Sequence, residues 1–379
     1  MRVLLLRSLL LAGCVVAALA PAPAQQPRRL SAEEHDQKLL SAQKVAADSA
    51  VVKKGSFTVK KIPGITDRPR EALANSKPPK PDEIRRAKAA NRTLQKAPLR
   101  AGAHLDPSFD LRDGRVAFPI QNQEQCGCCW IFGAVAAHEG NILFKNRNAT
   151  LGLSEQYVVD RLAATKGIDP CDGGWFDMSL NFLRDEGTST RMLFPYRGGV
   201  SNGRQERTTP IPFKASTVGY VGTSDNATPS VTEIKQAIAA YGAVTVAVYV
   251  GDAFQSYEKG IFGRGEPPGE VNHAVALVGW DDNPPEFKDD PALRDGTNGG
   301  VWILRNSWST AWGEQGYMRI AYNSSFVGYG AMWIEAQGGD PPGGSEIVPC
   351  GGKGSYQQQV QDRIKFYEDN YKQYLPTKP

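Results

Sequence analysis

Residues 123–130 read Q-E-Q-C-G-C-C-W, and this stretch decides how the rest of the chain is interpreted. Gln123 stands six residues before Cys129, and a tryptophan follows that cysteine. From residue 129 to 145 apolar residues recur at helical spacing, so the pattern predicts a helix that begins at Cys129. A helix N-terminus favours negative charge, and this position therefore favours a reactive thiolate.

Two residues farther along the chain complete a candidate catalytic site. His273 lies in the apolar run V-N-H-A-V-A-L-V-G-W, and Asn306 lies in N-S-W. A histidine beside the thiol can stabilise the thiolate and later protonate a leaving amine. Asn306 can orient the imidazole, and the Gln123 amide with the Cys129 N–H can bind an oxyanion. We therefore expect acyl transfer through a thioester, with water as the second nucleophile.

This set of residues resembles the papain family of cysteine proteases. The family signature is C-G-[SA]-C-[WY] around the nucleophile, with a histidine and an asparagine downstream. Here it reads C-G-C-C-W, so Cys128 replaces the small residue. The separation between Cys129 and Asn306 along the chain is longer than the family signature specifies, and an insertion at 281–300 accounts for the difference. Four more segments match in family order: 106–112 (D-P-S-F-D-L-R), 171–174 (C-D-G-G), 251–262 and 306–317.

The resemblance implies an α+β, two-lobed papain-like fold over residues 105–336. A mainly helical lobe would span about 120–215 and an antiparallel, β-barrel-like lobe about 216–335, with the active-site cleft between them. Outside the signature, the pattern predicts helices at 178–184 and 230–240. It also predicts strands at 243–250, 273–279, 301–306 and 316–321, with a long surface loop at 281–300.

The resemblance also implies roles for individual residues. The catalytic set would be Cys129, His273, Asn306 and Gln123. The substrate-binding set would be Gly173, Gly174, Trp175, Phe176, Ala274 and Trp308, in which the glycines bind the main chain and Trp308 shields the His–Asn pair. Glu335 would lie near the floor of the second subsite. We expect endopeptidase activity, because no histidine-bearing insertion follows Gly174, and we expect no metal or cofactor.

The six cysteines are 14, 126, 128, 129, 171 and 350. The resemblance implies a disulfide between Cys126 and Cys171. Cys128 and Cys350 could pair or stay free. Cys126 and Cys129 also form a C-x-x-C, which alone would suit redox or zinc chemistry, but the chain has no second C-x-x-C. His138 should point away from the thiol, because nine helical residues make about two and a half turns and so place it on the opposite face of the helix from Cys129.

Two other functions remain open at this stage. A papain-like chain could bind or adhere to peptides without turning them over. It could also act as an acyltransferase or transglutaminase with the same triad, if an amine rather than water accepts the acyl group.

The N-terminal part differs in composition from the rest. Residues 1–24 fit a cleaved secretory signal, although residues 11–14 (L-A-G-C) also resemble a lipobox that would make Cys14 a lipid anchor. Residues 25–104 contain 18 Lys and Arg against 8 Asp and Glu, whereas the remainder is acidic. We interpret 25–104 as a basic pro-region or linker that could inhibit the enzyme, or be a solvated tail.

The C-terminal part has a Gly/Pro-rich linker at 337–354 and a predicted amphipathic helix at 355–379, which could dock on the same chain or on a partner.

The chain of 379 residues is 41% hydrophobic and 22% charged, as is ordinary for a soluble protein. We expect peptide or protein substrates, no nucleic acid, a secreted or periplasmic location, and a membrane contact only if Cys14 is lipidated.

Overall fold

The computed structural model describes residues 52–91 and 105–337, except residue 55 and residues 114–118, 146–150, 202–212, 223–225, 264–268, 290–296 and 298. The chain divides into two units, residues 1–47 and 48–379, and every described residue belongs to the second. The predicted signal, the Cys14 lipobox, the C-terminal linker and the C-terminal helix all lie outside the described residues.

One twisted sheet organises this unit, with strand order β1-β2-β6-β9-β8-β7-β5-β10-β4 and with β3 paired to β7. Neighbouring strands are antiparallel except β6 and β9, which are parallel. The strands are β1 (Val52–Lys54), β2 (Phe57–Val59), β3 (Ser108–Asp110), β4 (Ala215–Tyr220), β5 (Val244–Val248), β6 (Tyr257–Phe262), β7 (His273–Asp281), β8 (Val301–Arg305), β9 (Tyr317–Ala321) and β10 (Tyr329–Ala336).

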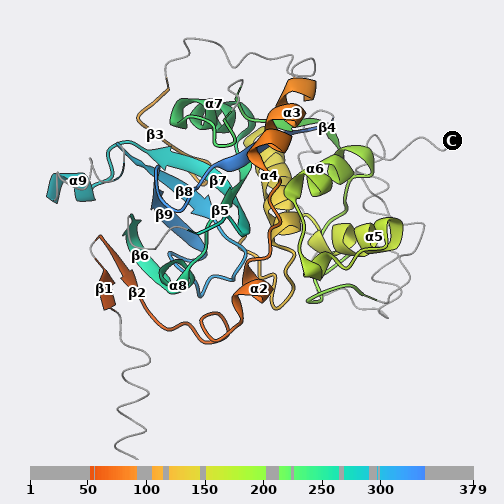
Figure 1. Ribbon diagram of the computed structural model, residues 1–379, viewed down its shortest axis with the longest axis horizontal. Coiled ribbons are helices and arrows are strands. Elements are labelled where there is room, and N and C mark those ends of the chain that lie inside the picture. Colours follow the sequence, from red (N-terminus) through yellow and green to blue (C-terminus); the bar gives the residue numbers. More distant parts are fainter. Residues whose placement is uncertain are drawn as a thin grey trace, which may run out of the picture. The chain divides into compact units, whose positions relative to one another are not determined.

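Helices pack beside this sheet (Figure 1). They are α2 (Arg70–Leu73), α3 (Pro81–Asn91), α4 (Cys129–Lys145), α5 (Glu155–Lys166), the 3-10 helix η1 (Pro170–Asp172), α6 (Phe176–Asp185), α7 (Val231–Tyr241), α8 (Asp252–Gln255) and α9 (Glu286–Asp289). The Ser230 side chain caps α7 in a capping box with Glu233, and Gly167 ends α5 in the left-handed conformation.

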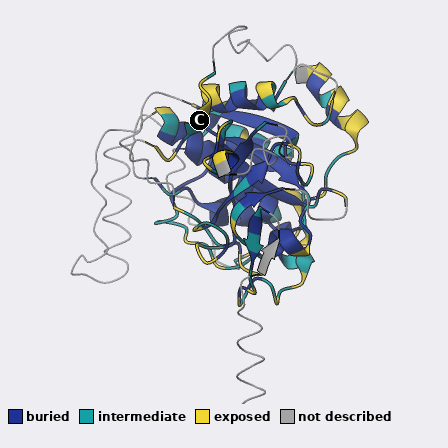
Figure 2. Cartoon of the chain, turned by 90° about the vertical axis from the view of Figure 1, so that its left-hand side faces the viewer, coloured by how far each residue is buried: buried dark blue, intermediate teal, exposed yellow. Residues whose placement is uncertain are grey.

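Two hydrophobic cores lie on opposite faces of β5 and β7, and the central helix α4 belongs to the first of them. On one side α4 packs against α5 and α6, and on the other side it packs against β7 and β5. The second core lies within the sheet and contains five buried tryptophans: Trp280, Trp302, Trp308, Trp312 and Trp333. Figure 2 shows this buried interior, with exposed residues confined to outer helices and loops. Small residues such as Gly133 allow close approach, since a Cβ there would lie 3.2 Å from Thr245.

The observed elements confirm the α+β class and most of the predicted elements. Helix α4 covers the predicted 129–145, and α6, α7, β5, β7, β8 and β9 fall within about two residues of their predicted positions. The expected loop at 281–300 includes the short helix α9. Helix α5 was not predicted, although Ser154 at its N-cap and Gly167 at its end are ordinary helix signals.

The segment 52–91 differs most from the sequence-based interpretation. It forms β1, β2, α2 and α3 and packs on the rest of the unit, whereas the sequence suggested a pro-region or linker rather than a packed domain. Strand β2 pairs with β6, and the side chains of Phe57, Leu73 and Ile84 are buried. These apolar residues are sparse, and their partners lie far along the chain, so local periodicity could not reveal them. We call residues 52–91 the pro-segment.

Within the part of the chain that the structure describes, no helix is both long and apolar enough to cross a membrane. The same residues contain no cluster of three or more His, Cys, Asp or Glu side chains suited to a metal ion.

Candidate active site

Cys129 occupies the first position of α4 and is fully buried. Its sulfur lies close to the backbone N–H groups of Ala274 and Asn75, which lower its pKa. Burial has the larger effect and raises the pKa of Cys129 to about 11. The Ala274 N–H belongs to the residue after His273, so the fold brings the thiol to the start of β7.

His273 and Asn306 meet because β7 and β8 are antiparallel neighbours. His273 is the first residue of β7, and Asn306 directly follows β8. His273 Nε2 lies 2.8 Å from Asn306 Oδ1, so Nε2 carries the hydrogen and Nδ1 remains available. Among the described residues, no hydrogen-bond partner of good geometry reaches Nδ1. Burial lowers the pKa of His273 to about 4.

Trp308 covers this pair. Its ring lies 4.8 Å from the His273 ring and is fully buried. Trp312 packs edge-on against Trp308, at 5.3 Å between ring centroids. The aromatic cover keeps water away from the His–Asn hydrogen bond and strengthens it.

Gln123 is held on both sides of its amide. Its Oε1 accepts a hydrogen bond of 2.7 Å from Ser307 Oγ, while its Nε2 donates to Cys126 O at 3.0 Å and to Leu73 O at 3.2 Å. Ser307 also donates its backbone N–H to Asn306 Oδ1 at 2.8 Å. Sequence reasoning missed Ser307, although it stands inside the N-S-W motif.

Gly173 and Gly174, which we call the glycine shelf, contact the pro-segment. Gly174 N donates to Asn75 O at 3.3 Å, and Lys77 N donates to Gly174 O at 2.8 Å. Ser76 and Gly174 form a parallel bridge. Gly173 has φ 90°, and a Cβ there would come within 2.2 Å of Asn75 O. The two glycines thus accept a neighbouring main chain that a larger residue would exclude.

The aromatic residues beside the glycine shelf pack against each other and are buried. Trp175 stacks on Phe176 at 3.9 Å between ring centroids, and both are buried. A Cβ on Gly330 would lie 2.5 Å from Trp175 and 3.6 Å from Ile84 of α3. Ala274 is buried beside the thiol.

The placement of Glu335 on the floor of this subsite is wrong. Glu335 pairs with Lys145 at 3.2 Å, at the last residue of α4. That end lies about 24 Å along the helix from Cys129. Gly330, five residues earlier in the chain, lies beside Trp175 instead.

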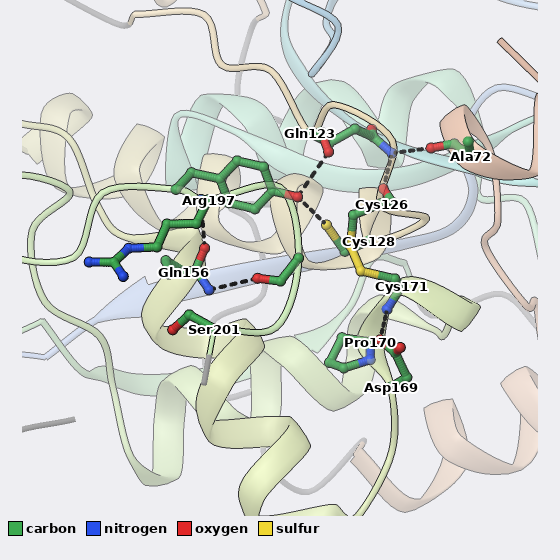
Figure 3. Close-up of a disulfide and its surroundings, with 12 residues drawn as sticks. Ala72, Gln123, Cys126, Cys128, Gln156, Asp169, Pro170, Cys171, Arg197 and Ser201 are labelled. Atoms are coloured by element: carbon green, nitrogen blue, oxygen red, sulfur yellow. Dashed lines mark hydrogen bonds between the residues drawn. A yellow bond between two sulfur atoms is a disulfide. The ribbon is translucent and has the colours of Figure 1, made fainter. Parts of the chain in front are cut away.

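The structure confirms the disulfide between Cys126 and Cys171, with an S–S distance of 2.05 Å (Figure 3). It joins the loop before α4 to η1, directly before the glycine shelf. Cys128 is free and buried, whereas Cys350 lies outside the described residues.

His138 is buried on α4, about 13 Å along the helix from Cys129. Besides burial, its pKa is affected by the main chain of Lys214 and by the charge of Lys145, and not by the thiol.

Comparisons with known proteins agree with this geometry. A model of the papain family cysteine proteases matches residues 105–336, more than half of the chain. A cathepsin L-like protein of Caenorhabditis elegans is 34% identical over 223 residues, which are 56% of this chain and 58% of that protein. Cysteine endopeptidase RepA of Oryza sativa subsp. japonica is 31% identical over 277 residues, or 69% of this chain and 68% of that protein. The chain spans about half the length of several curated relatives that it matches.

Solved proforms share the fold. The proform of the ragweed pollen cysteine protease Amb a 11 has a TM-score of 0.57 at 20% identity, and the match covers 79% of this chain and 84% of that one. Procathepsin L 3 from the larval midgut of Tenebrio molitor has a TM-score of 0.53 at 21% identity, with 80% and 87% covered. From the family match, the relatives and the shared fold, we conclude that the chain belongs to the papain family of cysteine proteases.

Proposed function

We propose that the chain is a cysteine endopeptidase that cleaves peptide bonds through a thioester on Cys129. The observation that carries the proposal is the buried hydrogen bond of 2.8 Å between His273 and Asn306. It forms at the start of β7, where the N–H of the next residue, Ala274, contacts the Cys129 sulfur. This arrangement supports Cys129 as the nucleophile, His273 as the acid and base, and Asn306 as the group that orients the ring.

The proposed reaction begins when the Cys129 proton moves to His273 Nδ1, the nitrogen that the bond to Asn306 leaves available. The sulfur forms a bond to the substrate carbonyl carbon, and the carbonyl oxygen becomes negative. Gln123 Nε2 and the Cys129 N–H stabilise that oxygen. His273 then gives its proton to the leaving amine as the C–N bond breaks. Water, deprotonated by His273, attacks the thioester and releases the acid and Cys129.

We place the substrate main chain on Gly174 and an apolar side chain beside Trp175. The hydrogen bonds that Asn75 O and Lys77 N make with Gly174 support this placement, because they show that the shelf can bind an extended chain. The burial of Trp175 and Phe176 favours an apolar rather than a charged side chain there.

We also propose that the pro-segment inhibits the enzyme until it is removed. Leu73 O accepts hydrogen bonds from Gln123 Nε2 and from Trp308 Nε1 at 3.3 Å, so it occupies the oxyanion donor that the substrate needs. The Cys129 sulfur meets the Asn75 N–H rather than a carbonyl carbon. The carbonyl oxygen at Gln123 belongs to Leu73, whereas the backbone group at the sulfur belongs to Asn75, and this offset supports a segment that fills the site without being cut.

Hydrolysis of a panel of fluorogenic dipeptides tests the peptidase. The chain activated by removal of the pro-segment should hydrolyse the apolar members, and Cys129→Ala should show no turnover. Cys128→Ser is the matched control, because it changes the adjacent buried thiol without touching the proposed nucleophile. Turnover by Cys129→Ala would contradict the proposal. Absence of both hydrolysis and labelling of Cys129 by a reactive-cysteine probe would indicate a binding protein, and capture by an added amine in preference to water would indicate an acyltransferase.

The inhibitor proposal has its own test. A chain that begins at Leu105 should hydrolyse the same substrates much faster than the full chain at equal concentration. Equal rates would contradict inhibition by the pro-segment and leave the peptidase proposal standing.

We propose an extracytoplasmic location, secreted or periplasmic, from the signal-like residues 1–24. Fractionation of expressing cells tests this, and a Cys14→Ser variant tests lipidation. Release of the wild-type chain into the soluble fraction would argue against the lipid anchor, whereas release by Cys14→Ser alone would support it.

A further inference from the structure

The hydroxyl of Tyr196 touches both ends of the loop that carries the oxyanion donors. It donates a hydrogen bond of 2.8 Å to the main-chain oxygen of Gln123. It also lies 3.3 Å from Cys128 Sγ. A tyrosine hydroxyl has a single hydrogen, which is used at Gln123, so the Cys128 S–H donates to the hydroxyl oxygen. Figure 3 shows Gln123 and Cys128 close together beside the disulfide.

These two contacts matter because the proposed oxyanion donors sit at the ends of this loop. One donor is the Gln123 side chain, and the other is the N–H of Cys129, the residue after Cys128. Cys128 is fixed to the helix, since its carbonyl accepts hydrogen bonds from Ile131 N at 2.9 Å and Phe132 N at 3.2 Å. A group that ties Gln123 to Cys128 therefore sets the separation of the two donors.

Apart from the side-chain bond from Gln123 Nε2 to Cys126 O, the loop has little main-chain hydrogen bonding within it. Glu124, directly after Gln123, has φ 55°, a conformation that non-glycine residues seldom adopt. The hydrogen bond within the turn, from Cys126 N to Gln123 O, is long at 3.3 Å. The Tyr196 bond to the same oxygen is much shorter. Tyr196 itself is held by its ring, which packs edge-on against Phe132 of α4 at 4.9 Å.

We infer that Tyr196 is a positioning residue for the oxyanion site, and that Cys128 acts with it by donating a hydrogen bond to its hydroxyl. This inference rests on the proposed peptidase function. Tyr196 does not touch substrate; it acts through the Gln123 backbone and through the first residue before α4. Its effect should appear in the step that develops negative charge on the carbonyl oxygen, and not in the formation of the thiolate.

Tyr196→Phe is the first test, in protein folded as the full chain and then activated. Loss of an oxyanion donor itself lowers kcat by a factor of about 100–1000, and misplacement of one should cost less, about tenfold. We expect kcat for a dipeptide amide to fall about tenfold while KM changes little. Alkylation of Cys129 by iodoacetamide should keep its wild-type rate, because that displacement builds no oxyanion. Equal losses of hydrolysis and alkylation would indicate general damage and overturn the inference.

A double-mutant cycle with Gln123→Ala gives the sharper test. If Tyr196 acts through Gln123, Tyr196→Phe in the Gln123→Ala background should change kcat by less than about twofold, because the donor that it positions is already absent. Full multiplication of the two single effects would show that Tyr196 acts elsewhere.

Substitutions of Cys128, which contacts the Tyr196 hydroxyl, provide a second test if Tyr196→Phe fails to fold. Cys128→Ser keeps a donor of similar size and should retain most of the activity, whereas Cys128→Ala should lose part of kcat with unchanged alkylation. Equal kcat for the serine and alanine variants would remove Cys128 from the inference. An inactive wild-type chain would instead count against the peptidase proposal, so the two failures can be told apart.

Discussion

At the scale of single residues, the covered site holds its two reactive groups in their neutral forms. Burial raises the pKa of Cys129 to about 11 and lowers that of His273 to about 4, so the thiol and the imidazole are both uncharged near neutral pH. An uncharged thiol is a poor nucleophile. We therefore propose that the pro-segment lowers the reactivity of Cys129 by excluding water as well as by blocking access.

The pH dependence of alkylation checks this state. In the full chain the thiolate of Cys129 is present only above its raised pKa, so at pH 7 its fraction is about one in ten thousand. We expect iodoacetamide to alkylate Cys129 slowly at pH 7 and faster towards pH 11, and to react quickly at pH 7 once the pro-segment is removed. A fast, pH-independent rate between pH 6 and 9 in the full chain would contradict this.

His138 should make the fold sensitive to acid. Both of its ring nitrogens are buried without a hydrogen-bond partner of good geometry among the described residues, and burial lowers its pKa from 6.5 to about 4. The neutral form favours the folded state, so this stability is complete above pH 6.5 and is lost as the pH falls towards 4. The loss is at most about 3 kcal/mol. Denaturant unfolding of His138→Leu should depend less on pH over this range than that of the wild type, and parallel curves would refute the assignment.

The candidate catalytic residues could be identified from the sequence because short motifs surround each of them. Cys129, His273 and Asn306 each stand in a recognisable pattern, and their order matches the family. Glu335 was misplaced because its position depends on the pairing of β10 with β4 and on the ion pair with Lys145, two contacts between residues distant in sequence. The contact of Tyr196 with Gln123 joins residues that are distant in sequence, and its chemistry is an ordinary hydrogen bond, so nothing in the sequence indicated it.

At the scale of elements, α4 and β7 were predictable and the pro-segment elements were not. Helix α4 has a long apolar pattern, and β7 is a nearly continuous apolar run, as a strand buried on both faces requires. Strand β2 has three residues, and its partner β6 lies some two hundred residues away. A strand of that length has no recognisable period, so only its pairing defines it.

Helix α3 gives a test of how firmly the pro-segment is docked. Ile84 is fully buried near Trp175 and Gly330, and Ile84→Ala should weaken docking by about 2–5 kcal/mol through lost burial and a cavity. We expect faster alkylation of Cys129 in the full chain, measured by mass spectrometry at pH 7. Arg86→Ala, on the exposed face of the same helix, is the control and should leave the rate unchanged. Equal rates for both variants would show that α3 does not keep the site closed.

At the scale of the whole molecule, the disulfide links the helical core to the glycine shelf. Cys126 and Cys171 are separated by 45 residues, and a cross-link of that length stabilises the fold by about 4 kcal/mol through the entropy of the unfolded chain. The double variant Cys126→Ser, Cys171→Ser should melt lower by roughly 10 °C. Cys128→Ser should melt close to the wild type. A double variant with an unchanged melting temperature would show that packing alone fixes the shelf.

Maturation has a consequence for solubility. Strand β2 covers one side of β6, so loss of the pro-segment turns β6 into a bare sheet edge with unpaired backbone groups. Edges of this kind recruit other strands unless charge protects them. The middle of β6 carries Glu258 and Lys259. Pairing with another copy would remove water from these two charged side chains, which disfavours it. Their replacement by valine should therefore make the matured enzyme, though not its precursor, aggregate in a light-scattering assay.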